Sequence, residues 1–301
     1  MKTNKIRGVV LPLIAAFIWG TAFVAQSVGA EIVEPFTFNA CRSVIAFFVL
    51  LAASFIFAKF KPKREKSPEQ KRFERKNLIL GGICCGAFLS CASCLQQAGL
   101  AVTSAGQAGF ITALYVVLVP IFGLFLKKKA PLPVWFGVIL AVGGLYLLCV
   151  SEGFTIERSD FLVFLCAIVF AFQILSIDHF VQYVDGVQLS CAQFFVTSVI
   201  CTALTFLFEN PSMAAIMDCA LPLLYVGIFS SGVAYTLQIL AQKDSNPTVV
   251  TILLSLESVF SVLAGAVILG DKLSAREYTG CVLMFAAVIM AQIHFPSRKK
   301  V

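Results

Sequence analysis

Hydrophobic residues along the chain form long runs that short polar segments separate. Ten of these runs extend over about 20 residues and contain almost no charged side chains. A helix of that length crosses the hydrocarbon core of a bilayer, which is ~30 Å thick. The predicted spans are residues 8–29, 35–58, 78–99, 104–126, 132–150, 160–178, 187–208, 219–241, 247–269 and 276–294. The pattern therefore predicts an all-α membrane protein with ten transmembrane helices.

The chain also resembles itself at a distance. Residues 103–132 align with residues 245–274, which lie 142 positions later, and the alignment has no gap until one residue is inserted near its end. In this alignment Glu257 falls on Tyr115. A match of this length between distant stretches indicates an internal duplication.

A second alignment, offset by 151 residues, places Arg42 on Gln193. Five of the predicted spans lie in each half of the chain. Because five is an odd number, the second half enters the membrane upside down relative to the first. We predict two inverted five-helix repeats, residues 1–150 and residues 151–301.

Lysine and arginine residues collect in alternate loops. If the N-terminus is cytoplasmic, the inner segments hold 19 of the 23 basic residues. Cytoplasmic loops carry such an excess, so we predict that both termini are cytoplasmic. The longest polar stretch, residues 59–77, has no apolar periodicity and is predicted to be a cytoplasmic linker. The net charge of +7 is a topology signal, and we expect no nucleic-acid partner.

Composition agrees with a protein that lies mostly in lipid, because 59% of the residues are hydrophobic and 13% are charged. Ten of the eleven cysteines fall within predicted spans, where cysteine packs as a small apolar residue. We expect no metal site and no cofactor. The loops are short, which leaves no separate soluble domain and suits a multi-pass protein of a bacterial inner (cell) membrane.

Glu257 is the one acidic residue near the middle of the ninth predicted span. A carboxylate at that depth costs several kcal/mol unless it is paired, protonated or hydrated. On a helical wheel it lies opposite an apolar stripe that we expect to face lipid, made of Val249, Ile252, Leu256, Val259 and Leu263. We predict that Glu257 lines a cavity and binds a cationic group or a proton. The alternative is a buried link to a hydroxyl group or to Arg42.

Arg42 lies about two helical turns into the second predicted span, on a stripe of polar and small residues. Three roles are open for it. The guanidinium can bind an anionic substrate group, pair with Glu257, or extend to the membrane interface.

Other polar and aromatic residues within the spans are further candidates for substrate binding. Tyr115 is favoured because it aligns with Glu257, and Trp19 lies in mid-span beside a glycine. The remaining candidates are Gln107, Gln193, Tyr235 and Gln238, and Gln97 and Gln173 are two more polar residues within spans or near their ends. Each of them can instead tie helices together by hydrogen bonds or pack in the core. Tyrosine and tryptophan near a carboxylate would suit an ammonium group by cation–π attraction.

Two stretches carry a family resemblance that covers nearly the whole chain. The first is Trp-Gly-Thr-Ala-Phe at residues 19–23, followed by the arginine of the second span. The second is the segment from Leu256-Glu257 to Leu273, with Ser258 and Asp271 where the family signature usually has proline and glutamate. The chain resembles the EamA-type members of the drug/metabolite transporter superfamily. The resemblance implies two inverted repeats around a central cavity, with the fifth and tenth spans outside it, and alternating access for small metabolites.

We therefore expect a secondary transporter of a small amphipathic or zwitterionic metabolite such as an amino acid, since one internal base and one internal acid suit a zwitterion. The alternatives are a transporter of quaternary amines or drugs, a non-transporting membrane scaffold, and an embedded enzyme. No His-Glu-x-x-His, Gly-x-Ser-x-Gly or P-loop motif occurs, so we expect no enzyme activity. The expected partners are a small-molecule substrate and the lipid bilayer. Proton coupling and a homodimer stay open.

Overall fold

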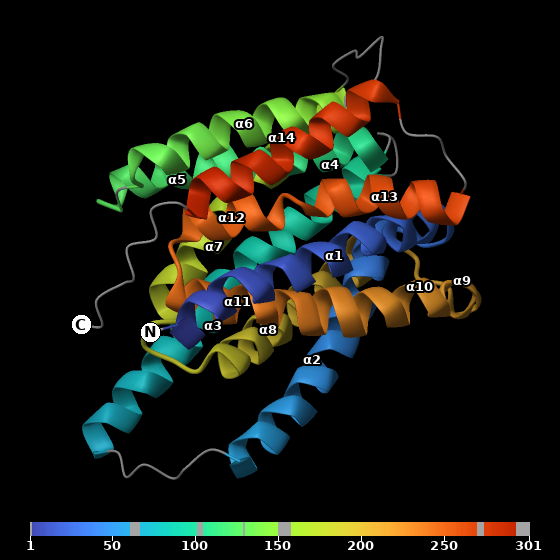
Figure 1. Ribbon diagram of the computed structural model, residues 1–301. Coiled ribbons are helices and arrows are strands. Elements are labelled where there is room, and N and C mark those ends of the chain that lie inside the picture. Colours follow the sequence, from blue (N-terminus) through green and yellow to red (C-terminus); the bar gives the residue numbers. More distant parts are fainter. Residues whose placement is uncertain are drawn as a thin grey trace.

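The computed structural model describes residues 2–60, 67–100, 105–128, 130–149, 158–269 and 274–292. Every secondary-structure element within these ranges is a helix (Figure 1). The predicted all-α class is therefore confirmed for the described part of the chain.

The helices fall into two groups along the chain, one before and one after residue 150. Those before residue 150 are α1 (Lys2–Ile32), α2 (Pro35–Phe60), α3 (Pro68–Leu100), α4 (Ala105–Ala113), α5 (Tyr115–Phe125) and α6 (Leu132–Cys149). Those after it are α7 (Arg158–Phe180), α8 (Gly186–Phe208), α9 (Met213–Asp218), α10 (Ala220–Tyr225), the π-helical segment η1 (Val226–Ala234), α11 (Tyr235–Asp244), α12 (Pro247–Leu254), α13 (Glu257–Leu269) and α14 (Ala275–Gln292).

Seven helical stretches in the described residues are long and apolar enough to cross a membrane. They are Arg7–Ile32, Pro35–Lys59, Pro68–Leu100, Ala108–Phe125, Asp160–Phe180, Gly186–Phe208 and Ala220–Asp244. Two shorter apolar stretches, Leu132–Leu148 and Pro247–Leu263, fall on the fifth and ninth predicted spans. The chain is thus a multi-pass helical membrane protein, whereas the count of ten spans in two repeats stays a prediction.

The third helix begins earlier than the sequence pattern predicts. Residues 59–77 were expected to form a linker, but α3 starts at Pro68 and extends ahead of its apolar part. A capping box starts it: the Ser67 backbone N–H donates to Gln70 Oε1 at 3.2 Å, and the Gln70 N–H donates to Ser67 Oγ at 3.2 Å. The linker prediction was wrong for this part because the polar helix is stabilised by its cap and not by an apolar face.

Helices from before and after residue 150 interlock. The most extensive pairings join α6 to α14, α2 to α8, and α3 to both α7 and α8. Glycines let α3 and α8 approach closely, because a Cβ atom on Gly82 would lie 2.7 Å from Ala192 Cβ and one on Gly86 would lie 2.7 Å from the Gln193 carbonyl oxygen. Figure 1 shows α6 and α14 side by side along one edge of the molecule. The core therefore lies between the two halves of the chain.

Two helices break at matching positions. Leu114 separates α4 from α5, and its N–H bonds to the Ile111 carbonyl at 3.2 Å. Leu256, which lies 142 residues later, precedes α13, and its N–H bonds to the Leu253 carbonyl at 3.3 Å. Both turns are tightened to the i−3 pattern of a 3₁₀-helix. Each turn is followed at once by a candidate site residue, Tyr115 or Glu257.

The prediction that an apolar stripe on α12 and α13 faces lipid is wrong. Val249, Ile252, Leu256 and Val259 are at most 3% exposed, and only Leu263 is open, at 38%. The reason is that α12 packs against α1, α5, α6, α11 and α14, so no side of it faces lipid. A single-helix wheel cannot reveal neighbours on the apolar side.

Candidate functional site

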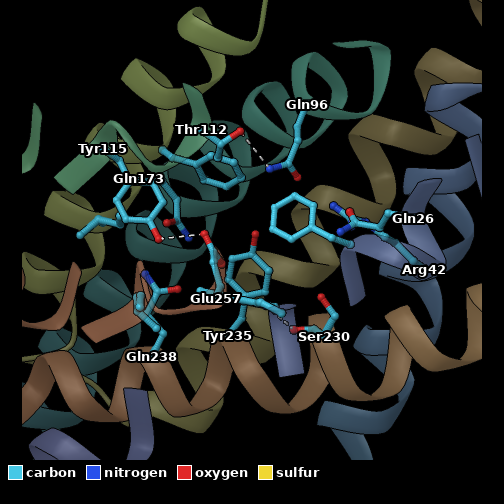
Figure 2. Close-up of a pocket in the computed structure, with 15 residues that line it drawn as sticks. Gln26, Arg42, Gln96, Thr112, Tyr115, Gln173, Ser230, Tyr235, Gln238 and Glu257 are labelled. Carbon is cyan, nitrogen blue, oxygen red and sulfur yellow. Dashed lines mark hydrogen bonds between the residues drawn. The ribbon is translucent and has the colours of Figure 1, made fainter. Parts of the chain in front are cut away.

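A buried polar cavity lies at the centre of the helices, with about 50 Å³ of space for water (Figure 2). A few water molecules fill such a volume. Its lining comprises Trp19, Phe23, Gln26, Arg42, Gln96, Thr112, Tyr115, Phe170, Gln173, Ile174, Ser230, Tyr235, Gln238, Leu254 and Glu257. These residues come from both halves of the chain, so the cavity exists only when the two halves are packed together.

Glu257 reaches the cavity from the first turn of α13 and is 4% exposed. Tyr115 Oη donates a hydrogen bond to Glu257 Oε1 at 3.2 Å. The start of a helix carries partial positive charge, which favours a carboxylate there. Of the alternatives for Glu257, the hydroxyl link is present, and the same side chain also lines the cavity.

Arg42 lies at the other end of the cavity in Figure 2, beside Gln26. Its Nη1 donates to Gln26 Oε1 at 2.7 Å, and the side chain is 4% exposed. No ion pair joins Arg42 to Glu257 in the described part of the chain. The predicted alternative of an Arg42–Glu257 pair is therefore wrong for this conformation, because α2 and α13 place the two groups at opposite ends.

Aromatic rings and the π-helical segment form one wall. The Trp19 and Tyr235 rings meet edge to face with centroids 4.8 Å apart. Trp19 Nε1 donates to the Ser230 carbonyl at 3.2 Å, and the Tyr235 N–H bonds to the same oxygen. The wide turn of η1 gives this i−5 bond, and such turns occur often at functional sites.

Two pairs of glutamines support the wall on the side of Glu257. Gln242 Nε2 donates to the Ile174 carbonyl at 2.9 Å, and Gln238 Nε2 donates to Gln242 Oε1 at 3.4 Å. In the second pair, Gln173 Nε2 donates to Gln193 Oε1 at 3.3 Å. Gln173 and Gln238 line the cavity, whereas their partners lie behind it.

Six of the eight candidate residues line the cavity: Trp19, Arg42, Tyr115, Tyr235, Gln238 and Glu257. Gln193 is fully buried behind the wall and reaches the cavity only through its bond to Gln173. The side chain of Gln107 lies outside the described residues. Substrate binding by these residues stays a prediction.

Sequence reasoning missed four polar residues of the lining: Gln26, Gln96, Thr112 and Ser230. Gln26 follows Trp19 by seven residues and therefore lies on the same helix face, which was a usable signal. Gln96 Nε2 bonds to Thr112 Oγ1 at 3.5 Å, a contact between helices that no single-helix pattern contains.

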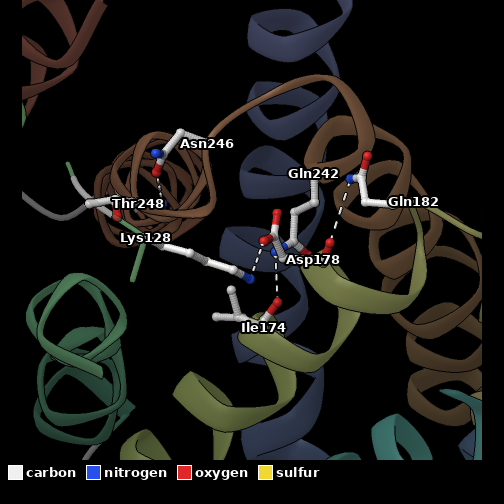
Figure 3. A network of polar contacts seen from close by, with 7 residues as sticks. All are labelled: Lys128, Ile174, Asp178, Gln182, Gln242, Asn246 and Thr248. Carbon is white, nitrogen blue, oxygen red and sulfur yellow. Dashed lines mark hydrogen bonds and ion pairs between the residues drawn. The ribbon is translucent and has the colours of Figure 1, made fainter. Parts of the chain in front are cut away.

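Polar contacts tie the halves together at each end of the bundle. On the side of the N-terminus, Lys128 Nζ forms an ion pair with Asp178 Oδ2 (Figure 3). At the other end the Glu209 carboxylate accepts the Phe36 and Thr37 backbone N–H groups, each at 2.7 Å, and so caps α2. Both ties join a residue before position 150 to one after it.

No cluster of metal-ligating side chains occurs within the described ranges. The fold and the cavity together define the class: a multi-pass helical membrane protein with a small polar chamber between its halves. The family model of the EamA-like transporter family matches the chain twice, over residues 6–150 and 158–292. The chain therefore belongs to the EamA-like transporter family within the drug/metabolite transporter superfamily, as the resemblance predicted, and is a membrane transporter.

Two curated relatives carry transporter names. An uncharacterized transporter of Archaeoglobus fulgidus is 30% identical over 284 residues, which cover 93% of this chain and 84% of that protein. The uncharacterized transporter YoaV of Bacillus subtilis is 21% identical over 94% of this chain and 95% of its own length. A solved crystal structure has the same fold, with a TM-score of 0.76 and 18% identity over 95% of this chain and 96% of that one.

Proposed function

We propose that the protein is a secondary transporter that moves a small zwitterionic metabolite, such as an amino acid, by alternating access. It has ten transmembrane helices in two inverted five-helix repeats, residues 1–150 and 151–301. The substrate occupies the polar cavity between the repeats. No chemical step is required of the protein.

One observation carries the proposal: the cavity holds a guanidinium at one end and a carboxylate at the other (Figure 2). Charged groups are rare inside membrane segments, and where they occur they commonly mark a substrate or ion pathway. Arg42 suits a carboxylate because its planar fork donates two parallel hydrogen bonds. Glu257 suits an ammonium, and the Trp19 and Tyr235 rings line the same cavity.

Alternating access is supported by the helix breaks and by the size of the cavity. Discontinuous helices at equivalent positions of two repeats are a common feature of transporter binding sites. Pockets that enclose small ligands measure about 300–1,000 Å³, whereas this cavity offers about 50 Å³. The helices must separate before a substrate enters, and the ties at the two ends are the contacts that have to open.

The orientation rests on charge. With both termini in the cytoplasm, the lysine-rich and arginine-rich loops lie inside, in agreement with the positive-inside rule. We assign the protein to a bacterial inner membrane. Reporter fusions at the C-terminus and near residue 155, between the two repeats, test the orientation, since only the second fusion should report from outside.

The function is tested by counterflow into proteoliposomes that contain the purified protein. Vesicles loaded with one unlabelled solute are diluted into the labelled solute, for a panel of amino acids, quaternary amines, nucleotide sugars and drugs. We expect accumulation of one or a few zwitterions above the level of protein-free vesicles. Movement of quaternary amines or drugs alone would contradict the zwitterion assignment, and no movement of any solute would contradict transport. Repeating the assay with an imposed pH gradient tests proton coupling.

A further inference from the structure

The orientation of one cavity glutamine is fixed by the backbone. Gln242 must direct its Nε2 at the Ile174 carbonyl, since a carbonyl only accepts. Its Oε1 is then the atom that meets Gln238, so Gln238 must present Nε2 to it, at 3.4 Å. The Oε1 of Gln238 is left on the cavity side. It is buried and accepts no hydrogen bond from the described residues.

A second buried acceptor lies at the same end of the cavity. Gln173 donates its Nε2 to Gln193 Oε1, which leaves Gln173 Oε1 without a donor and Gln193 Nε2 without an acceptor within the described part of the chain. Figure 2 shows Gln173, Gln238, Tyr115 and Glu257 grouped at one end, away from Arg42 and Gln26. The carboxylate of Glu257 adds further acceptor positions, of which Tyr115 uses one. This end of the cavity is therefore rich in acceptors that lack donors.

Buried acceptors in protein interiors are normally matched by donors, and an occupant that fails to supply them leaves the acceptors unpaired. A primary ammonium has three N–H donors in a compact group. It can donate to Glu257, Gln238 and Gln173 at once. A quaternary ammonium carries the same charge and has no N–H donor, so it would bury these oxygens without partners.

We propose that Glu257, Gln238 and Gln173 form a subsite for the primary ammonium group of the substrate, and that Gln238 rejects fully methylated amines. This inference rests on the proposed transport function and narrows its substrate class. Glu257 attracts any cation, whereas the two glutamine oxygens form hydrogen bonds only with a cation that has N–H groups. Sites that hydrogen-bond a substrate N–H commonly discriminate strongly against analogues that lack it.

The test uses matched pairs of amines. Binding to the purified protein is measured by thermal stabilisation for each of the common amino acids and for its N,N,N-trimethyl form, and hits are repeated in counterflow. We expect a primary amine to bind about 100-fold or more tightly than its trimethyl form. In Gln238→Met, which keeps the length of the side chain and removes the acceptor, the ratio should fall to below tenfold. Gln182→Met, an exposed position outside the cavity, should keep the wild-type ratio.

The outcomes separate this inference from the transport function. Transport of zwitterions with equal binding of the trimethyl forms overturns the ammonium subsite and leaves the transport function standing. Strong discrimination in binding without counterflow supports the subsite and contradicts transport. Discrimination that survives unchanged in a folded Gln238→Met protein overturns the assigned role of Gln238. A panel in which neither form of any amine binds overturns both.

Discussion

At the scale of residues, the contact between Tyr115 and Glu257 is the most informative one. The two residues occupy matching positions in the duplicated stretches, and their side chains touch. In the proposed inverted layout, equivalent residues meet only near the axis that relates the repeats. An acid at both positions would place two carboxylates in contact, where like charges resist joint ionisation. With tyrosine in one copy, the pair instead has a single carboxylate and a hydroxyl group that donates a hydrogen bond to it.

Replacing the carboxylate tests its role directly. Glu257→Gln keeps the shape and removes the charge, so we expect counterflow of a zwitterion to fall at least tenfold while membrane abundance stays unchanged. Tyr115→Phe removes one donor and leaves the charge, and its effect should be smaller. Counterflow and immunoblots of membranes measure both. Normal transport by Glu257→Gln would remove this residue from the site.

The separation of Arg42 from Glu257 predicts independence in the empty protein. Groups that lie more than about 7–10 Å apart and share no partner give effects on stability that add within about 0.5 kcal/mol. We expect the shifts in thermal midpoint of Arg42→Gln and Glu257→Gln, measured without ligand, to sum to that of the double variant. A double variant clearly more stable than this sum would reveal an ion pair between the two residues.

Much of the cavity was predictable from polar residues within apolar spans, because burying such residues needs a reason. Glu257, Arg42 and Tyr115 were found in this way. The sequence did not show which of the glutamines near span ends line the cavity, because a glutamine at a helix end is equally stable facing water or a neighbouring helix. The place of Gln96 in the cavity follows from its contact with Thr112 on another helix, and that contact depends on how the helices pack.

At the scale of elements, the positions of the helix breaks could not be predicted from the residue types along the chain. Prolines mark helix breaks in sequence reading, yet Pro12 and Pro120 lie inside α1 and α5. The breaks fall instead at Leu114 and at the pair Ser255 and Leu256, and leucine has good helix propensity. The structural origin therefore lies in packing between helices. The long apolar runs predicted that each helix exists, whereas the positions of the breaks depend on contacts with neighbouring helices.

The approach of α1 to α13 gives a prediction at this scale. A Cβ atom on Gly20 would lie 2.6 Å from the Glu257 carbonyl oxygen and 2.9 Å from the Ser261 nitrogen. These are backbone atoms that cannot rotate away, so Gly20→Ala must displace α13 and its first-turn carboxylate. We expect a loss of about 1–3 kcal/mol in stability together with impaired binding.

Gly109→Ala is the matched control for this substitution. Among the described residues, nothing lies within 4 Å of a Cβ atom placed there, and the residue is in the helix α4. Alanine is favoured over glycine in a helix by up to about 1 kcal/mol, so the thermal midpoint should hold or rise. A Gly20→Ala protein as stable as wild type would show that α1 and α13 are not in firm contact.

At the scale of the whole molecule, the two halves are interlocked and not merely adjacent. Within the described part of the chain, the helix pairs with the most extensive packing join one half to the other, and the cavity and both end ties do the same. Opening to one side therefore requires the halves to move against each other while the contacts at the opposite end persist. The Lys128–Asp178 pair is a charged contact on the side of the N-terminus, where Asp178 is fully buried and Lys128 partly exposed.

Removing this tie should favour the state that is open to that side. In Lys128→Gln we expect faster hydrogen exchange in peptides covering residues 174–182 and 242–250, which surround the pair (Figure 3). Exchange at the start of α2, which Glu209 caps, should be unchanged. Lys127→Gln removes a neighbouring exposed lysine and serves as the control. Equal exchange in the two variants would mean that the ion pair does not hold this end closed.

The small size of the cavity has a consequence for the effect of pressure. A chamber with room for only a few water molecules has to gain volume when a metabolite enters, and the surrounding helices cannot compensate by compression because interiors are already densely packed. Hydrostatic pressure favours whichever state occupies less volume. Compression should thus expel the substrate and slow the transport cycle well before it unfolds the helices.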